Sequence, residues 1–192
     1  MRNRNIDIFI SGAGPAGLLA SLSFASLGYS VFCVDSKKPV TQSNEDGADL
    51  RTTAFLQPAK TFMASLGLWE KLEHFAIPME IMRIIDSAGD IWPPIETTAK
   101  DFLASEISDL PFGWNIPNWL LRRTLLENAM EYSNLELKFG LTTSSITRRD
   151  DAAFVYLNDG SQIKSKLIIG ADGRDSLAVS YTHLTLPTNR EV

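Results

Sequence analysis

The chain has 192 residues, of which 44% are hydrophobic and 21% are charged, and its formal net charge at pH 7 is −5. This composition is that of a globular protein with one sizeable core or two small ones, which excludes a disordered or fibrous chain. An acidic chain also lacks the basic face of a nucleic-acid-binding protein, so we expect no nucleic-acid partner. The single cysteine, Cys33, can form no internal disulfide, which is compatible with a reducing compartment.

The first predicted elements lie in a stretch without charged side chains, from Ile8 to Val34. A membrane span or a signal peptide is one interpretation of such a stretch. Three glycines and a proline between positions 12 and 17 interrupt it, however, and this favours a soluble α/β unit. The stretch and its flanks then divide into a strand, a helix and a strand, at residues 6–10, 15–27 and 29–34.

The middle of the chain has a less regular pattern. Apolar residues recur at helical spacing on both sides of Gly67, and a strand pattern follows them. The tryptophan and two prolines at positions 92–94 then begin a stretch that we expect to be irregular as far as Pro111. The predicted elements are helices at 56–66 and 68–74, a strand at 79–86 and a turn at 88–90.

The last third of the chain predicts one long helix followed by short strands. Residues 118–132 form an amphipathic pattern, and the Asn158-Asp159-Gly160 turn predicts a hairpin. The predicted strands lie at 135–139, 153–157, 161–163 and 167–169.

A glycine motif stands between the first strand and the first helix. In the pattern Gly-x-Gly-x-x-Gly, Gly12 allows a tight turn, Gly14 lets the backbone approach a pyrophosphate, and Gly17 permits close packing of helix on strand. The free amides at the helix start then face the phosphates. Asp35 ends the second strand, where an acid accepts hydrogen bonds from an unphosphorylated ribose.

The alternative to this interpretation is a glycine-rich turn that binds nothing. A lone glycine pattern would leave both interpretations open, but strand, glycines, helix, strand and acid occur here in the order of a dinucleotide-binding unit. The pattern does not separate NAD from FAD.

Further segments join the glycine motif: Gly12-Ala13-Gly14-Pro15-Ala16-Gly17 is followed by Arg51 and by Gly170-Ala171-Asp172-Gly173-Arg174. With these residues the chain resembles the para-hydroxybenzoate hydroxylase type of flavoprotein monooxygenase, from about Ile6 to Ala178. Two more segments are Leu66-Gly67-Leu68-Trp69 and Phe112-Gly113-Trp114-Asn115-Ile116-Pro117-Asn118, and in these the chain resembles the ubiquinone-biosynthesis hydroxylases within that group. This resemblance implies an α/β, Rossmann-like FAD-binding domain with a partial inserted β-rich substrate region, and FAD as the cofactor.

The resemblance implies roles for two residues in the middle of the chain. Arg51 matches an arginine that reaches the flavin or its pyrophosphate, whereas a surface salt bridge with the acidic residues at 45–49 is the alternative. Asn118 matches a polar side chain that approaches FAD, although a helix N-cap would also explain it.

Asp172 follows an apolar strand, at the edge where open α/β sheets bind ligands. The resemblance implies that it holds the ribose and pyrophosphate region of FAD and that Arg174 closes over the site. The alternative is an ordinary Asp-Gly turn with a solvated arginine. The implied cofactor-binding residues are therefore Gly12, Gly14, Pro15, Ala16, Gly17, Asp35, Arg51, Asn118, Asp172, Gly173 and Arg174.

No catalytic residue and no metal site is predicted. His74 lies on an apolar helical face and His183 lies near the end of the chain, so they make no ligand pair. Similar enzymes reduce FAD with NAD(P)H and use dioxygen to hydroxylate an electron-rich aromatic ring. Four aromatic residues could line a pocket for such a ring or could simply be core: Trp92, Phe112, Trp114 and Trp119.

The expected domain organisation is discontinuous. Residues 1–76 and 118–178 form the FAD-binding domain, and residues 77–117 form a partial substrate region. Residues 179–192 are expected to be a non-native tail, because the sequence from Val179 resembles a translated sequencing-library adapter; a genuine tail of strand-forming residues is the alternative. The expectation is thus a truncated fragment of a longer flavoenzyme, inactive alone.

For the parent enzyme, the resemblance implies hydroxylation of an aromatic ring in ubiquinone biosynthesis, with NAD(P)H and dioxygen. Because that substrate carries a polyprenyl chain, it also implies a cytoplasmic enzyme that works at the inner-membrane surface, in a biosynthetic complex. Two alternatives remain: a flavoprotein reductase or hydroxylase of a soluble aromatic substrate, and a nucleotide-binding fragment without turnover.

Overall fold

The computed structural model describes residues 3–88, 95–149 and 152–173. Two compact units make up the chain: Met1–Ala48 together with Leu121–Val192 form the first unit, and Asp49–Leu120 form the second. Predicted features that lie outside the described residues are Gly89, Asp90, Trp92, Arg174, His183 and the segment 179–192.

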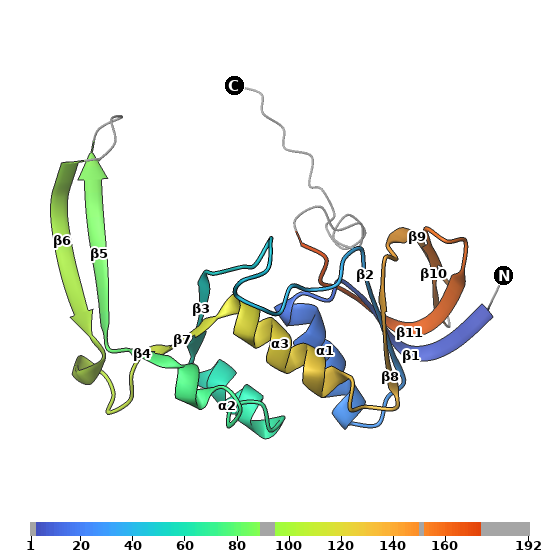
Figure 1. Ribbon diagram of the computed structural model, residues 1–192, viewed down its shortest axis with the longest axis horizontal. Helices are drawn as coiled ribbons and strands as arrows, with labels where there is room; N and C mark the ends of the chain where they lie inside the picture. The colour runs from blue at the N-terminus through green and yellow to red at the C-terminus, as the bar shows by residue number, and fades with distance from the viewer. Residues whose placement is uncertain (1–2, 89–94, 150–151, 174–192) are drawn as a thin grey trace. The chain divides into compact units, whose positions relative to one another are not determined.

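The first unit is built on a six-stranded sheet in the order β8-β2-β1-β11-β10-β9 (Figure 1). Strands β8, β2, β1 and β11 are parallel to their neighbours in this series, and β10 and β9 extend the sheet by antiparallel pairing. Parallel strands in this order, with β1 inside, are typical of dinucleotide-binding sheets. The bounds are β1 (Asn3–Ser11), β2 (Val31–Asp35), β8 (Leu135–Phe139), β9 (Thr143–Arg148), β10 (Ala153–Leu157) and β11 (Gln162–Gly170).

Two helices confirm their sequence predictions. Helix α1 (Pro15–Ser26) connects β1 to β2 and contacts both strands. Helix α3 (Asn118–Ala129) starts at the predicted residue and ends three residues before the predicted end; the division between the two units falls within it.

The central strands are buried on both faces, which explains the long stretch without charges in the sequence. Phe9, Phe32 and Val34 join a buried apolar cluster with side chains from β9, β10 and β11. Because side chains alternate along a strand, the neighbouring Ile10 and Cys33 point to the opposite face, and both are fully buried. A parallel sheet covered on both faces needs such continuous apolar strands.

The two strands predicted at 161–163 and 167–169 are in fact one. β11 runs without a break through Ser165 and Lys166, pairing with β10 on one side and with β1 on the other. The polar pair concealed this continuity because a buried strand is expected to be apolar. Inside the sheet, the hydroxyl of Ser165 has two backbone acceptors for its single proton, Leu167 O at 2.7 Å and Asp7 O at 3.1 Å.

The second unit contains a three-stranded sheet, a two-stranded ribbon and short helices. The sheet has the order β3-β7-β4, and the ribbon pairs β5 with β6 antiparallel. Helix α2 confirms the helix predicted at 56–66, and β5 confirms the strand predicted at 79–86 with a shift toward the C-terminus. The bounds are β3 (Thr52–Leu56), α2 (Gln57–Ser65), η1 (Glu73–Phe75), β4 (Ile77–Met79), β5 (Ile81–Ala88), β6 (Ile95–Leu103), η2 (Ala104–Glu106) and β7 (Gly113–Pro117).

The prediction of a helix at 68–74 is wrong. The chain there makes consecutive turns that end in η1, and Trp69 O accepts hydrogen bonds from the amides of both Leu72 and Glu73. These turns bury Leu68, Trp69 and Leu72 at the same three- and four-residue spacing as a helix would. The apolar pattern therefore reported the buried face correctly and the backbone conformation incorrectly.

The prediction of an irregular stretch from 92 to 111 is also wrong over much of its length. Residues 95–103 form β6, which pairs with β5 from Ile81–Leu103 to Ala88–Ile95. Strand β6 shows no alternation of apolar and polar residues, because its side chains from Thr97 to Leu103 are exposed except for the half-buried Phe102.

The compact units differ in extent from the domains expected from the sequence. Residues 49–76 pack with the second unit, whereas the sequence analysis assigned them to the FAD-binding domain. Packing within a unit does not decide which residues contact a cofactor, so the domain assignment stays a prediction. Of the helices in the described residues, none has the length and apolar character needed to cross a membrane.

One carboxylate, that of Asp7, connects three strands of the large sheet. Asp7 Oδ2 accepts hydrogen bonds from the amide and the hydroxyl of Ser30, at 2.9 and 2.6 Å, and Lys166 Nζ lies 2.7 Å from Asp7 Oδ1. Three strands are thereby connected, because Asp7 lies in β1, Ser30 precedes β2 and Lys166 lies in β11. The bonds from Lys166 and then Ser30 hold the pKa of Asp7 well below its ordinary value.

This linkage predicts how the stability of the protein depends on pH. A carboxyl whose pKa is lower in the folded state stabilises the fold above its unfolded pKa, near 3.8, and loses that contribution as the pH falls toward the folded value. We therefore expect Asp7→Asn to lower the free energy of unfolding at pH 7, and the difference from the unsubstituted chain to shrink steadily below pH 4. Urea unfolding of both proteins across this pH range measures it. A difference that is constant with pH would contradict the linkage.

Candidate functional site

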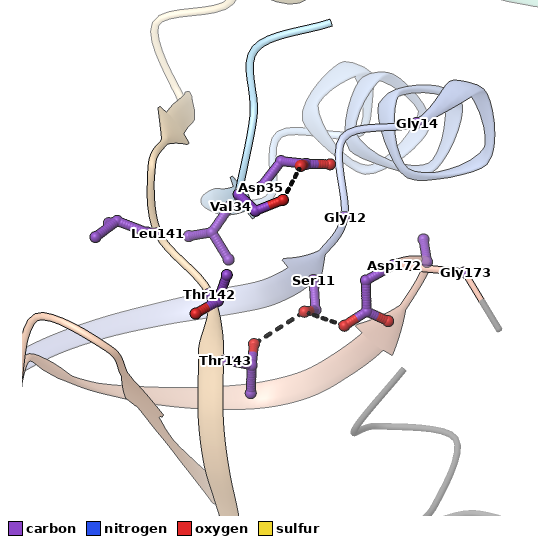
Figure 2. Close-up of a pocket in the computed structure, with 12 residues that line it drawn as sticks. Ser11, Gly12, Gly14, Val34, Asp35, Leu141, Thr142, Thr143, Asp172 and Gly173 are labelled. Carbon is purple, nitrogen blue, oxygen red and sulfur yellow. Dashed lines mark hydrogen bonds between the residues drawn. The ribbon is translucent and has the colours of Figure 1, made fainter. Parts of the chain in front are cut away.

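The glycine loop lies between β1 and α1, as its spacing predicts (Figure 2). Gly12 has φ +103°, and its amide donates to Val34 O at 2.7 Å. Helix α1 then begins after Gly14 with Pro15 in its first turn, with no side-chain cap and no acidic residue there. The first amides of a helix have no partner inside the helix, so this uncapped start is suited to an anion.

The three glycines have different surroundings. A Cβ on Gly12 would collide with the backbone of the segment after β11, lying 2.6 Å from Asp172 Cα, and a Cβ on Gly17 would collide with Gly12 O. A Cβ on Gly14 would meet nothing within 4 Å. Gly12 and Gly17 therefore allow the backbone to pack on itself, whereas Gly14 borders open space.

Asp35 ends β2 and turns back toward the glycine loop (Figure 2). Its Oδ2 accepts the Ala13 amide at 2.7 Å, and its Oδ1 accepts the Lys37 amide at 2.9 Å. Asp35 thus fixes the glycine loop as well as bordering the pocket beside it. The sequence predicted that Asp35 borders the ligand site, but it did not predict the hydrogen bond from Asp35 to the glycine loop.

Asp172 lies just past the end of β11, beside the glycine loop. Its Oδ2 accepts the Ser11 hydroxyl at 2.7 Å, and Ser11 Oγ also lies 2.9 Å from Thr143 Oγ1 (Figure 2). Gly173 follows with φ +90°. Sequence reasoning found Asp172 and Gly173 but missed Ser11 and Thr143; the available signal was a serine at the end of an otherwise apolar buried strand.

These side chains surround a pocket at the carboxyl-terminal edge of the sheet, with a volume of about 480 Å³. That size is within the usual range for small-molecule sites, and this edge is where open α/β sheets bind ligands. The lining residues come from the ends of β1, β2 and β11 and from the segment that leads into β9. They are Ser11, Gly12, Gly14, Val34, Asp35, Ser36, Leu141, Thr142, Thr143, Ala171, Asp172 and Gly173.

Arg51 and Asn118, the other two predicted cofactor residues within the described chain, belong to a polar network of the second unit. Arg51 Nε and Nη2 donate to the two carboxylate oxygens of Asp49, at 2.8 and 2.9 Å. Asn118 Nδ2 donates to Asp49 Oδ2 at 3.0 Å, and Asn118 Oδ1 accepts the Thr53 hydroxyl at 2.6 Å. The salt bridge considered for Arg51 is therefore present, with Asp49 as its partner.

Asp49 is the centre of this network and was not predicted to have a role in the site. Its side chain is 10% exposed, whereas that of Arg51 is 83% exposed. The hydrogen bonds from Arg51, supported by that from Asn118, hold the pKa of Asp49 well below its ordinary value. Asp49 therefore stays ionised near neutral pH and keeps Arg51 and Asn118 in place.

Of the aromatic residues considered for a substrate pocket, Trp114 packs against a second tryptophan, Trp69. The rings of Trp114 and Trp69 meet edge to face, with centroids 5.4 Å apart, and Lys60 Nζ lies 4.5 Å from the centre of the Trp114 ring. Trp114 thus takes part in the packing of the second unit. In the parts of the chain that the structure describes, no group of three or more histidine, cysteine or acidic side chains could hold a metal ion.

The geometry of the first unit fits a dinucleotide. An uncapped helix start and open space over Gly14 suit a pyrophosphate, and carboxylates at the ends of β2 and β11 suit ribose hydroxyls. The first unit is therefore a nucleotide-binding domain of the Rossmann-like class.

Comparison with known proteins narrows this class. The sequence profile of the FAD binding domain matches residues 5–192, so the chain belongs to the FAD binding domain family. The matched range includes residues 179–192, whose assignment as a non-native tail stays a prediction.

Curated relatives and solved structures give the same picture. Ubiquinone hydroxylase UbiM of Neisseria meningitidis is 27% identical over 173 residues, covering 88% of this chain and 36% of that protein. The 3-demethoxyubiquinol 3-hydroxylase of Escherichia coli is 26% identical over 176 residues, covering 92% of this chain and 43% of that protein. The flavin-dependent monooxygenase PieE, solved with FAD and substrate, has the same fold, with a TM-score of 0.70 at 21% identity over 93% of this chain and 32% of its own. The chain thus spans about two fifths of the length of these curated relatives.

The glycine geometry makes a prediction about stability. Gly12→Ala would place a Cβ against the Asp172 backbone at a positive φ, so we expect it to lower the free energy of unfolding by more than about 2 kcal/mol. Gly14→Ala meets no neighbour, so we expect a loss below about 1 kcal/mol. Chemical unfolding of the two variants measures the difference. Equal stability of the two would contradict the close contact at Gly12.

Proposed function

We propose that the whole protein is an FAD-dependent monooxygenase that hydroxylates the aromatic ring of a polyprenylated ubiquinone precursor, using NAD(P)H and dioxygen. The observation that carries this proposal is the similarity of the chain to two hydroxylases of ubiquinone compounds, in a chain that belongs to the FAD binding domain family. The pocket at the sheet edge supports it, because its amides, hydroxyls and carboxylates match the polar half of FAD.

Each group around the pocket has a distinct proposed part in holding FAD. The amides at the start of α1, at Ala16 and Gly17, donate to the pyrophosphate, and Pro15 sets the direction of the helix there. Asp35 accepts from ribose hydroxyls, and Asp172 with Gly173 borders the ribose and pyrophosphate region. When bound, FAD supplies the electron transfer and the activation of dioxygen, which amino-acid side chains do not provide.

The physical chemistry of the proposed substrate extends this proposal to location. A polyprenyl chain partitions into a lipid bilayer because each buried methylene contributes about 0.8 kcal/mol. We therefore propose a cytoplasmic protein that reaches its substrate at the inner-membrane surface, together with other enzymes that act on the same lipid.

Arg51 allows a sharp test of its proposed contact with FAD. Arg83 makes a bidentate ion pair of the same kind in the β5–β6 ribbon of the same unit. Its Nε and Nη2 donate to the two carboxylate oxygens of Asp101, at 2.7 and 2.8 Å. If Arg51 contacts the cofactor, we expect Arg51→Ala to raise the Kd for FAD about fivefold, whereas Arg83→Ala leaves it unchanged. Titration of FAD fluorescence with each purified variant measures both. Equal Kd values for the two variants would identify Arg51 as part of a surface salt bridge only.

The activity itself requires the whole protein. We expect purified whole protein to carry the absorbance of bound flavin and to consume NAD(P)H and dioxygen faster with a polyprenyl phenol in phospholipid vesicles than with a soluble phenol. Product analysis must show one added ring hydroxyl for each NAD(P)H consumed. A preference for the soluble phenol would support a hydroxylase of soluble aromatics, and a colourless protein would contradict the cofactor assignment.

A further inference from the structure

Ser11 is the last residue of β1, and both its backbone and its side chain are hydrogen-bonded at the carboxyl-terminal edge of the sheet. Its side chain is nearly buried, and the residue as a whole is 3% exposed. Its backbone oxygen accepts the Ala171 amide at 2.7 Å, and its hydroxyl reaches Asp172 Oδ2 at 2.7 Å. The same residue thus fixes both the backbone and the carboxylate of the segment after β11.

The direction of the hydrogen bonds follows from counting protons. A serine hydroxyl has one proton, and a carboxylate can only accept, so Ser11 gives its proton to Asp172. Thr143, 2.9 Å away, must then be the donor toward Ser11 Oγ. The three side chains therefore form a chain of two hydrogen bonds along the wall of the pocket, in which Thr143 donates to Ser11 and Ser11 donates to Asp172 (Figure 2). We call this chain of hydrogen bonds the relay.

The carboxylate of Asp172 does not need the hydrogen bond from Ser11 to compensate for burial of its charge. Asp172 is exposed, so water could solvate its carboxylate without Ser11. What the hydroxyl adds is orientation: an exposed aspartate would sample several rotamers, whereas one held by a buried donor keeps a single one. The hydroxyl of Ser11 is itself held in place by the hydrogen bond from Thr143. The segment that carries Thr143 is attached to the end of β2, because the amide of Leu141 donates to Asp35 O at 3.2 Å.

We propose that Ser11 and Thr143 are positioning residues that hold the carboxylate of Asp172 in the orientation in which it binds FAD. This inference rests on the proposed contact between Asp172 and the cofactor. It adds two residues to the site, one of which lies at the strand end just before the glycine motif, and it assigns them an effect on affinity that acts through Asp172.

The chain offers a matched control outside the pocket of the same unit. Ser30 Oγ donates to Asp7 Oδ2 at 2.6 Å, and neither residue lines the pocket, so Ser30→Ala removes a serine-to-aspartate hydrogen bond that does not border it. We expect Ser11→Ala to raise the Kd for FAD about tenfold, and Ser30→Ala to leave it unchanged. Titration of FAD fluorescence gives the Kd, and thermal unfolding of each variant gives the stability change. Equal Kd values for the two variants would overturn the proposal.

Variants at Thr143 and Asp172 separate positioning from simple structural support. We expect Thr143→Val, which lacks the hydroxyl, to raise the Kd about threefold, and Thr143→Ser, which keeps it, to leave the Kd unchanged. On an Asp172→Ala background, Ser11→Ala should have no further effect, because the relay then has no carboxylate to orient. A further loss on that background would overturn the proposal, since Ser11 would then act by another route.

The same measurements distinguish failure of the inference from failure of the proposed function. If Asp172→Ala leaves the Kd unchanged, Asp172 does not contact the cofactor and the proposed site is wrong at that residue. If Asp172→Ala raises the Kd and Ser11→Ala and Thr143→Val do not, the site stands and the relay is wrong. Absence of FAD binding by the unsubstituted chain would contradict the cofactor assignment for this chain, and with it the proposed part of Asp172 here.

Discussion

The close contact between two loops at the carboxyl-terminal edge of the sheet is the constraint on which the site depends. Gly12 lies against the backbone of Ala171 and Asp172 so closely that no side chain fits between them. This contact is possible because β1 and β11 are parallel neighbours, so that their ends arrive together although about 160 positions separate Ser11 from its partner Gly170. The glycine loop and the Asp172 segment thereby become two walls of one pocket.

Sequence reasoning predicted the glycine loop well because each of its determinants is local. A buried strand, three glycines at fixed spacing, an uncapped helix and Asp35 all lie within one βαβ unit, and physical rules relate each to a phosphate or a ribose. The position of Asp172 beside that loop could not be obtained in this way. It came from a resemblance to a family, because no local rule states which distant strand pairs with β1.

The parts that sequence reasoning missed share a physical cause. Ser11 and Thr143 are joined across 132 positions, and Asp49 and Asn118 across 69, so it is the folded chain and not the local sequence that brings these partners together. Hydroxyl and amide side chains give no periodic signal comparable to that of apolar residues. Strand β6 was missed for the related reason that a strand with no buried face shows no alternation.

The bonds that Asp35 and Arg51 already make do not remove them from the proposed site. A carboxylate accepts about four hydrogen bonds, so Asp35 can fix the Ala13 amide and still accept from a ribose hydroxyl. The side chain of Arg51 is 83% exposed, so water can solvate its guanidinium if the proposed contact with FAD takes it away from Asp49. Asp49 would then keep the hydrogen bond from Asn118.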